Sequence, residues 1–359
     1  MKRFLILCIL VSLFTQACSS HNQDTHDQIE QPLFSYSLVA NDKIEITGIN
    51  DRMLKSVELP THINGYEVIG ISDRAFRRNQ FLESIVISQG IEYIGMFAFE
   101  HSAIRSVHFD ENSNLKSIGL KAFFGAKELM VINLPQGTEI ISSYAFAHTD
   151  HLRSLYIPKS VTFIGSNIIL ESGVEDIVFE DDSQLSTLSR LAFKDATRLK
   201  ALSIPNGVTI LNDYLFQGAT SLMEVDLPET LEQIGYGTFQ YTVCLGEVII
   251  PESVKVIKTR AFSESGIEKI MFHEDSKLTS IDQFAFYNSK DLAYIIIPES
   301  ITHIGYAAFS QTNAILYFLI DQPLDSFEDG WNLDDNKVYW LSEWHFNNEH
   351  IPEPNLEND

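Results

Sequence analysis

Apolar residues recur along this chain at intervals of 23 or 24 residues. With Phe99 as a reference position, Ile94 lies five residues earlier and Ile91 eight residues earlier, and the same frame fits ten further references. The eleven references are Phe76, Phe99, Phe123, Phe146, Ile169, Phe193, Phe216, Phe239, Phe262, Phe286 and Phe309. Five residues before each reference the chain carries Ile or Leu in every unit. A pattern that keeps its phase over so many periods indicates a repeat architecture.

Each unit also contains a short alternation of inward apolar and outward residues, which predicts a β-strand. Residues 152–158 and 245–251 are examples, and both end in Pro. Proline has no N–H to donate to a ladder, so it ends the strand. Other units replace it with an acidic turn, as at residues 110–113 and 180–183.

A single unit buries too little surface to offset roughly 1–2 kcal/mol of backbone entropy per residue. Stacked units solve this problem, because equivalent strands pair in parallel about 4.8 Å apart. The excess of Phe, 24 residues, is then explained by one ring per coil in an interior ladder. We expect about eleven repeats between residues 60 and 320 to form an elongated rod.

These repeats resemble the BspA-like leucine-rich repeats, whose consensus is close to L-x-x-I-x-I-P-x-x-V-x-x-I-G-x-x-A-F. Residues 297–309 (IPESITHIGYAAF) are a nearly complete copy, and residues 59–68 resemble the family's first, longer unit. The resemblance covers residues 34–340. It implies a repeat solenoid, a right-handed leucine-rich repeat superhelix with a parallel β-sheet on one face. It also implies a bacterial surface protein associated with adhesion or host-matrix binding, although a fold does not fix a function.

The first residues are typical of an export signal. Lys2 and Arg3 precede an apolar stretch that is too short to span a bilayer, and the small residue Ala17 stands before Cys18. This order resembles a bacterial lipoprotein signal over residues 1–17, with Cys18 as the lipid anchor, at the outer membrane or cell surface. Plain secretion is the alternative, since Thr15 stands where such signals usually carry Leu.

The rest of the chain divides around the repeats. Residues 18–33 are expected to be a flexible tether and residues 34–59 an N-terminal cap. Residues 60–320 hold the repeats, residues 321–350 a C-terminal cap containing Trp331, Trp340 and Trp344, and residues 351–359 a disordered tail.

Charge and cysteine content narrow the possible partners. The formal charge is −24, and loss of Lys2 and Arg3 with the leader would lower it by two more units. Such a surface disfavours nucleic acid and anionic lipid. Of the three cysteines, only Cys244 lies within the repeats, where we expect it to be a buried apolar filler.

Catalytic chemistry is not indicated. The chain has no G-x-S-x-G, H-E-x-x-H, Walker or G-x-G-x-x-G motif, so we predict no enzyme and no cofactor. His148, Asp150 and His151 are the tightest group of possible metal ligands, but we interpret them as exposed polar residues of a turn. Asp181-Asp182 and Glu274-Asp275 lack the alternating oxygen ligands of a calcium loop, so no metal site is predicted.

The outward residue of each strand offers the best candidate surface, because stacking aligns these residues in one column. The predicted ligand-binding face comprises His108, Asn133, Tyr156, Ser203, Asp226, Ile249, Met271 and Ile296, with Tyr294 nearby. Its C-terminal end is apolar, which favours an interaction site unless the C-terminal segment folds over it.

Three functions remain open at this point. The leading hypothesis is a non-catalytic cell-surface binding or adhesion protein that engages a protein or glycan, such as host extracellular matrix, through this face. The alternatives are a structural or assembly component of the cell envelope and, least supported, an enzyme.

Overall fold

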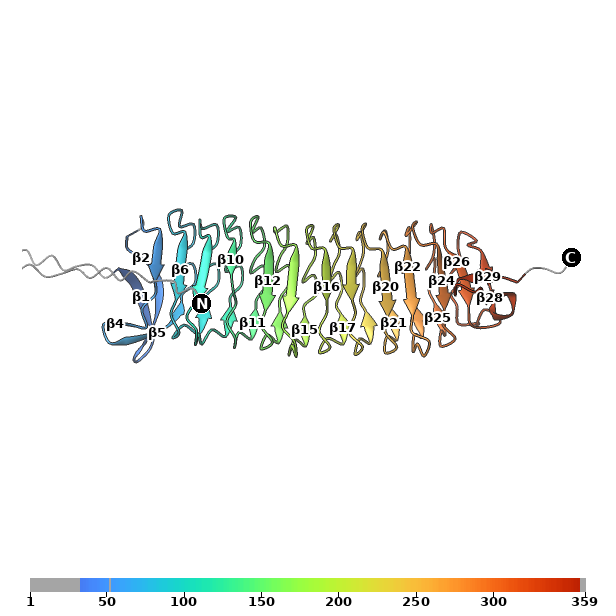
Figure 1. The fold of residues 1–359 in the computed structure, drawn as a ribbon, viewed down its shortest axis with the longest axis horizontal. Helices are drawn as coiled ribbons and strands as arrows, with labels where there is room; N and C mark the ends of the chain where they lie inside the picture. The colour runs from blue at the N-terminus through green and yellow to red at the C-terminus, as the bar shows by residue number, and fades with distance from the viewer. Residues whose placement is uncertain (1–32, 52, 356–359) are drawn as a thin grey trace, which may run out of the picture. The chain divides into compact units, whose positions relative to one another are not determined.

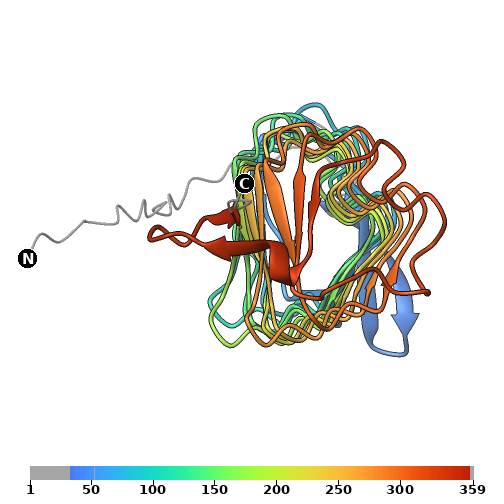
Figure 2. The ribbon, with the colours of Figure 1, turned by 90° about the vertical axis from the view of Figure 1, so that its right-hand side faces the viewer.

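The computed structural model describes residues 33–51 and 53–355. The predicted signal, Cys18 and the tether up to residue 32 lie outside the described residues. Within the described part, successive coils stack in one row from β1 to β29 (Figure 1). Viewed along the stack, the coils superpose on one another (Figure 2). The predicted solenoid of stacked parallel coils is confirmed, with about 13 turns when the terminal coils are included.

One side of the coils carries the alternating strands that the sequence predicts. They pair in parallel as three sheets, and we call their outer surface the long-strand face. The strands are β3 (Ser56–Glu58), β6 (Ser84–Ile87), β8 (Ser106–Phe109), β10 (Val131–Ile132), β12 (Ser154–Ile157), β14 (Asp176–Phe179), β16 (Ala201–Ser203), β18 (Glu224–Asp226), β20 (Glu247–Ile250), β22 (Lys269–Phe272), β24 (Tyr294–Ile297), β26 (Ile315–Phe318) and β27 (Val338–Tyr339).

A second ladder of two-residue strands was not predicted as a sheet of its own. Each strand ends at the Ile or Leu five residues before the reference, and the strands pair in parallel from coil to coil except between β15 and β17. We call their outer surface the short-strand face. The strands are β7 (Tyr93–Ile94), β9 (Ser117–Ile118), β11 (Ile140–Ile141), β13 (Phe163–Ile164), β15 (Thr187–Leu188), β17 (Ile210–Leu211), β19 (Gln233–Ile234), β21 (Val256–Ile257), β23 (Ser280–Ile281) and β25 (His303–Ile304).

The N-terminal end is closed by longer strands. β1 (Phe34–Ala40) and β2 (Lys43–Ile49) form an antiparallel hairpin, and β2 pairs in parallel with β5 (Tyr66–Ile71), which also pairs with β4 (His62–Ile63). The hairpin therefore joins the short-strand ladder directly and occupies its otherwise open edge.

The C-terminal end is closed by aromatic side chains. Trp331 meets the Phe309 ring edge-on at 6.5 Å, and Trp340 lies 4.5 Å from the Phe318 ring. A 3-10 turn, η1 (Leu341–Glu343), leads into an antiparallel hairpin of β28 (Trp344–Phe346) and β29 (Pro352–Pro354). The prediction that the chain is disordered from residue 351 is therefore wrong for residues 352–354, because β28 supplies a pairing edge for them.

The reference phenylalanines form the predicted interior ladder. Neighbouring rings are stacked with centroids 5.0–5.5 Å apart, from Phe76 to Phe146 and again from Phe193 to Phe309. All of these rings are buried. Burial contributes about 1.5–3 kcal/mol for each ring, so the ladder is a major source of cohesion between coils.

The backbone around each reference residue makes this stacking possible. The N–H of Phe99 donates to the carbonyl of Ala122 in the next coil, and Phe76 and Phe123 make the same bond. Residues two before and two after every reference have positive φ, so the chain turns back sharply around the ring. None of these positions holds a β-branched residue, in keeping with the steric cost of the left-handed region.

Ile169 marks a break in the ladder. Here the N–H of Ile168, rather than that of the reference residue, donates to Ala192 of the next coil. Ile168 and Ile169 are both fully buried and fill the space that Ala and Phe occupy elsewhere. The irregular unit therefore changes the local packing while the stack continues through it.

Cys244 does not lie in the core as predicted. It is exposed, and its neighbour Val243 is 56% exposed, whereas Leu245 is fully buried. Thr242 and the strand-entry Leu245 face inward in this turn, so Val243 and Cys244 between them are left outside.

Replacing Phe216 with Ala is expected to lower the free energy of unfolding by about 3–5 kcal/mol, because it removes a fully buried ring between two stacked neighbours. Phe163→Ala is the matched control, since this ring is 37% exposed on the short-strand face. Urea unfolding followed by circular dichroism measures both changes. Equal losses in the two variants would contradict the interior ladder.

Candidate binding face

The long-strand face carries two rows of outward side chains. Eight of the nine predicted residues form the first row, and parallel register places them in line, for example Ser203 beside Asp226 and Ile249 beside Met271. A second row lies two residues earlier in each strand and includes Asp176, Glu224, Glu247 and the predicted Tyr294. Sequence reasoning found only Tyr294 of this row, although the same alternation that selects the first row points to it.

Apart from the breaks between the three sheets, pairing along this face is reduced to a single residue pair at two places. β14 and β16 pair only at Asp176 and Ala201, and β18 and β20 pair only at Glu224 and Glu247. Beyond these single pairs the strands separate, and a cleft of about 430 Å³ lies at the first opening and one of about 670 Å³ at the second. Ser203 and Asp226 lie between the two clefts, on strands that remain paired over three residues.

Carboxylates border both clefts. Asp176, Glu224 and Asp226 line the first, and Glu224, Asp226, Glu229 and Glu247 line the second. The Ser203 hydroxyl donates to the Asp226 carboxylate at 2.5 Å, and Lys269 lies 3.6 Å from Glu247. The middle of the face therefore presents negative charge beside the apolar side chains of Val178 and Ile249.

On the N-terminal side of the first cleft, neighbouring groups shift the pKa values of Glu180 and Tyr156. Gln136 donates to the Glu180 carboxylate at 2.7 Å and the backbone N–H of Lys159 donates at 2.9 Å, and together they lower the pKa of Glu180. Partial burial, with the nearby charges of Glu180 and Asp181, raises the pKa of Tyr156. Both effects favour a charged Glu180 and a neutral Tyr156 near pH 7.

The C-terminal part of the face is apolar. Ile249 is 59% exposed, and Met271, Tyr294 and Ile296 are partly exposed. The β28–β29 hairpin extends outward from the ring of coils (Figure 2), and its Trp344 packs on Tyr317, the next residue of the row. Tyr317 is consequently only 3% exposed, whereas the hairpin leaves Ile249 open.

The remaining members of the predicted set are also at the surface. His108, Asn133 and Tyr156 are exposed on the N-terminal half of the face. β8 and β10 pair Val107 with Ile132, so His108 and Asn133 follow as neighbours. The nine predicted residues thus lie on one face, but they span several coils and do not converge on one point.

The residues considered as metal ligands have separate partners. His148 lies 3.4 Å from Glu171, Asp150 lies 3.3 Å from Lys127, and His151 lies 3.9 Å from Glu128. Within residues 33–51 and 53–355, no three His, Cys, Asp or Glu side chains are placed to hold a metal ion. The same residues include no helix long and apolar enough to cross a membrane.

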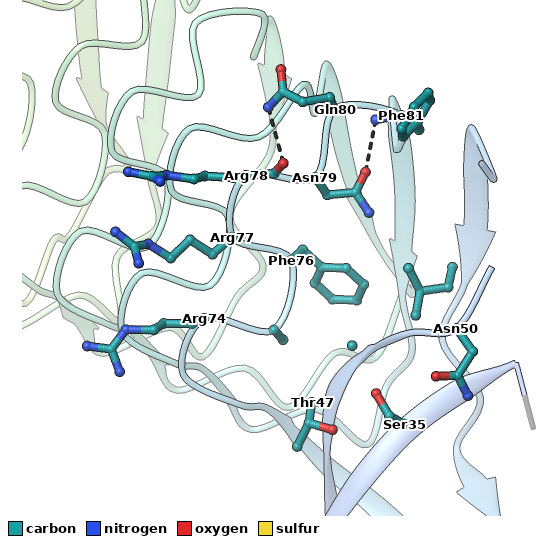
Figure 3. Close-up of a pocket in the computed structure, with 13 residues that line it drawn as sticks. Ser35, Thr47, Asn50, Arg74, Phe76, Arg77, Arg78, Asn79, Gln80 and Phe81 are labelled. Carbon is teal, nitrogen blue, oxygen red and sulfur yellow. Dashed lines mark hydrogen bonds between the residues drawn. The ribbon is translucent and has the colours of Figure 1, made fainter. Parts of the chain in front are cut away.

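A further pocket, not signalled by any motif, lies at the N-terminal end of the stack (Figure 3). Ser35 and Thr47 from the terminal hairpin border it, together with Phe76 and Asn79 of the first repeat. The Asn79 side chain accepts the backbone N–H groups of Phe81 and Leu82, so its oxygen is already engaged within the loop. Part of the polar lining of this pocket, the Asn79 oxygen, is therefore already used to close the turn.

The repeat units identify the family. A family model described as the BspA type leucine rich repeat region matches six copies, over residues 47–175 and 186–316. This chain belongs to that family. No curated protein matches the chain.

Solved structures of repeat proteins are similar to this chain over most of their length. A leucine rich cell surface protein from Faecalibacterium prausnitzii is 18% identical, with a TM-score of 0.43, over 84% of this chain and 96% of the other. The T. pallidum leucine rich repeat protein is 26% identical, with a TM-score of 0.45, over 59% and 88%. The pneumococcal vaccine antigen PcpA is 19% identical, with a TM-score of 0.43, over 87% of each chain.

Proposed function

We propose that this protein is a non-catalytic surface protein that binds a protein or glycan, such as a component of host extracellular matrix, through its long-strand face. The observation that carries the proposal is the exposed apolar strip of Ile249, Met271 and Ile296 beside the acidic cleft at β18 and β20. Contiguous exposed apolar surface next to a polar border is typical of an interaction site.

The shape of the face favours binding over catalysis. Its two clefts are open and shallow grooves between strands, and their carboxylates are spread over several coils rather than gathered around one reacting atom. An enzyme needs a preorganised constellation that excludes water, which a surface of this kind does not provide. Membership of a leucine-rich repeat family agrees with this interpretation.

A double substitution tests the face. Ile249→Ser with Met271→Ser is expected to weaken binding at least tenfold, because it removes the centre of the apolar strip while leaving the buried residues of β20 and β22 intact. Purified extracellular matrix proteins and glycan arrays supply the ligands, and the Kd of each saturable hit is measured by biolayer interferometry.

The matched control is Ile140→Ser with Ile210→Ser, two side chains 40% and 43% exposed on the short-strand face. This control is expected to bind like the parent protein. Equal weakening of both variants would place the site elsewhere. The absence of any saturable hit, with stable co-purification in an envelope complex, would favour the structural alternative.

We also propose that the chain is exported and held at the outer membrane or cell surface by lipid on Cys18. The order of basic residues, apolar stretch and Ala17-Cys18 supports this location.

Replacing Cys18 with Ala is expected to release the protein into the medium, because a diacyl anchor holds a chain at a membrane and the described domain offers no membrane-spanning helix. Mass spectrometry of the mature N-terminus of the parent protein should show a lipid-modified Cys18. An unmodified N-terminal residue, or cleavage at another position, would contradict the anchor.

A further inference from the structure

The turns around the first reference residues place cations and aromatic rings together in an otherwise acidic protein. Arg74, Phe97, Lys121 and Tyr144 occupy the same position in four successive coils, two residues before the reference, and each has positive φ. Arg78 lies two residues after the first reference, also with positive φ. We call Arg74, Arg78, Lys121, Phe97, Phe124 and Tyr144 the turn ridge.

Two of the three cations of the turn ridge, Arg74 and Lys121, contact aromatic rings. The Arg74 guanidinium lies 5.1 Å from the Phe97 ring centre, and the Lys121 ammonium lies 4.7 Å from Phe124 and 5.2 Å from Tyr144. Among the residues that the structure describes, no carboxylate oxygen lies within 4.0 Å of a charged nitrogen of Arg74, Arg78 or Lys121.

The chain has 49 acidic and 25 basic residues, so the ridge brings cations together in a protein whose net charge is negative. Two carboxylates lie beside these turns. Asp73 accepts the backbone N–H of Met96 at 2.7 Å, and Glu100 is largely buried and is bound by Arg77. Figure 3 shows the side chains of Arg74, Arg77 and Arg78 extending side by side away from Phe76 and from the pocket behind it. The positive charge is therefore presented to solvent.

The spacing and the rings restrict the ligand. Arg74 and Lys121 are two coils apart, about 10 Å along the stack at the usual strand separation. Phe97 lies in the coil between Arg74 and Lys121, and Tyr144 lies in the coil after Lys121. Phe97, Phe124 and Tyr144 are half-buried. A linear ligand that follows this ridge needs negative groups at intervals and apolar faces between them.

We propose that the turn ridge binds an anionic polysaccharide, with its carboxylate or sulfate groups on Arg74, Arg78 and Lys121 and its sugar faces on the rings. Arg matches planar or tetrahedral oxyanions through paired N–H donors, and aromatic faces accept the C–H faces of sugars. An anionic bilayer is disfavoured, because no ring projects from the ridge and the surrounding protein surface is negative. The ridge is separate from the long-strand face, so this inference does not depend on the proposed function.

The test uses the full mature protein with size-defined heparin oligosaccharides, and with polygalacturonate fragments to separate sulfate from carboxylate recognition. The triple variant Arg74→Gln, Arg78→Gln, Lys121→Gln is expected to raise the Kd for at least one probe tenfold or more. Its dependence on salt should also fall, since fewer counterions are displaced on binding. Isothermal titration calorimetry at several salt concentrations measures both.

The charge-matched control is Arg190→Gln, Arg198→Gln, Lys290→Gln, which removes three exposed cations outside the ridge. It is expected to bind like the parent protein. Equal weakening in the two triple variants would overturn the proposal, because net charge alone would then account for binding. Parent protein that binds neither probe would also overturn it.

A second variant tests the rings. Phe97→Leu with Tyr144→Leu keeps the charges, and Leu191 shows that the same turn position accepts Leu at positive φ. This variant is expected to weaken probe binding at least threefold with an unchanged melting curve. Unchanged binding, or equally tight binding of single-stranded DNA or anionic vesicles by the parent, would reduce the ridge to a non-specific anion site and contradict the proposal.

Discussion

Stacking of identical turns in constant phase is the constraint on which the whole structure depends. A coil of 23 or 24 residues has no core of its own, and its reference ring becomes buried only when the next coil places an equivalent ring about 5 Å away. The backbone enforces the same phase, because the reference N–H reaches a carbonyl of the following coil and two left-handed residues bring the chain back around the ring. The unit at Ile169 shows that the stack tolerates an irregular coil. The hydrogen bond moves by one residue and two isoleucines replace Ala and Phe, yet the coils on either side stay stacked.

The same constraint determines what the surfaces can do. Each position of the repeat recurs in every coil, so the equivalent side chains lie in a column on the surface. A substitution in one coil therefore places a new side chain within a few ångströms of the equivalent residues in the neighbouring coils. On the long-strand face this gives an acidic centre with two openings in the sheet and an apolar C-terminal strip. On the turn side it gives a run of cations and rings. The protein therefore carries a negative face and a positive ridge at different positions of the repeat.

Much of the fold could be predicted from the sequence, since periodicity reports directly which residues face inward. The phenylalanine ladder, the alternating strands and the family resemblance all follow from residues such as Phe99, Ile94 and Ile297. The exposure of Cys244 could not be predicted, because an apolar neighbour in the chain does not imply an apolar neighbour in space. The pairing of residues 352–354 depends on a turn at Asn347, whose side chain accepts the backbone N–H groups of Glu349 and Ile351, whereas Pro352, Pro354 and the acidic residues around them pointed to disorder. For the candidate face, alternation indicated the outward row but not the openings, which arise where parallel pairing fails. The turn ridge required knowledge of which residues meet across coils.

Removal of one whole repeat tests the central claim most directly. Deletion of residues 194–216, a complete 23-residue period from one reference to the next, joins Phe193 to Gln217 in phase. Thermal unfolding followed by circular dichroism should then show a folded protein with a cooperative transition close to that of the parent. Deletion of residues 194–205, about half a period, should abolish that single transition, because the coils after the junction can no longer stack in phase on the coils before it. A half-period deletion that folds as well as the whole-period deletion would contradict stacking in phase as the basis of the structure.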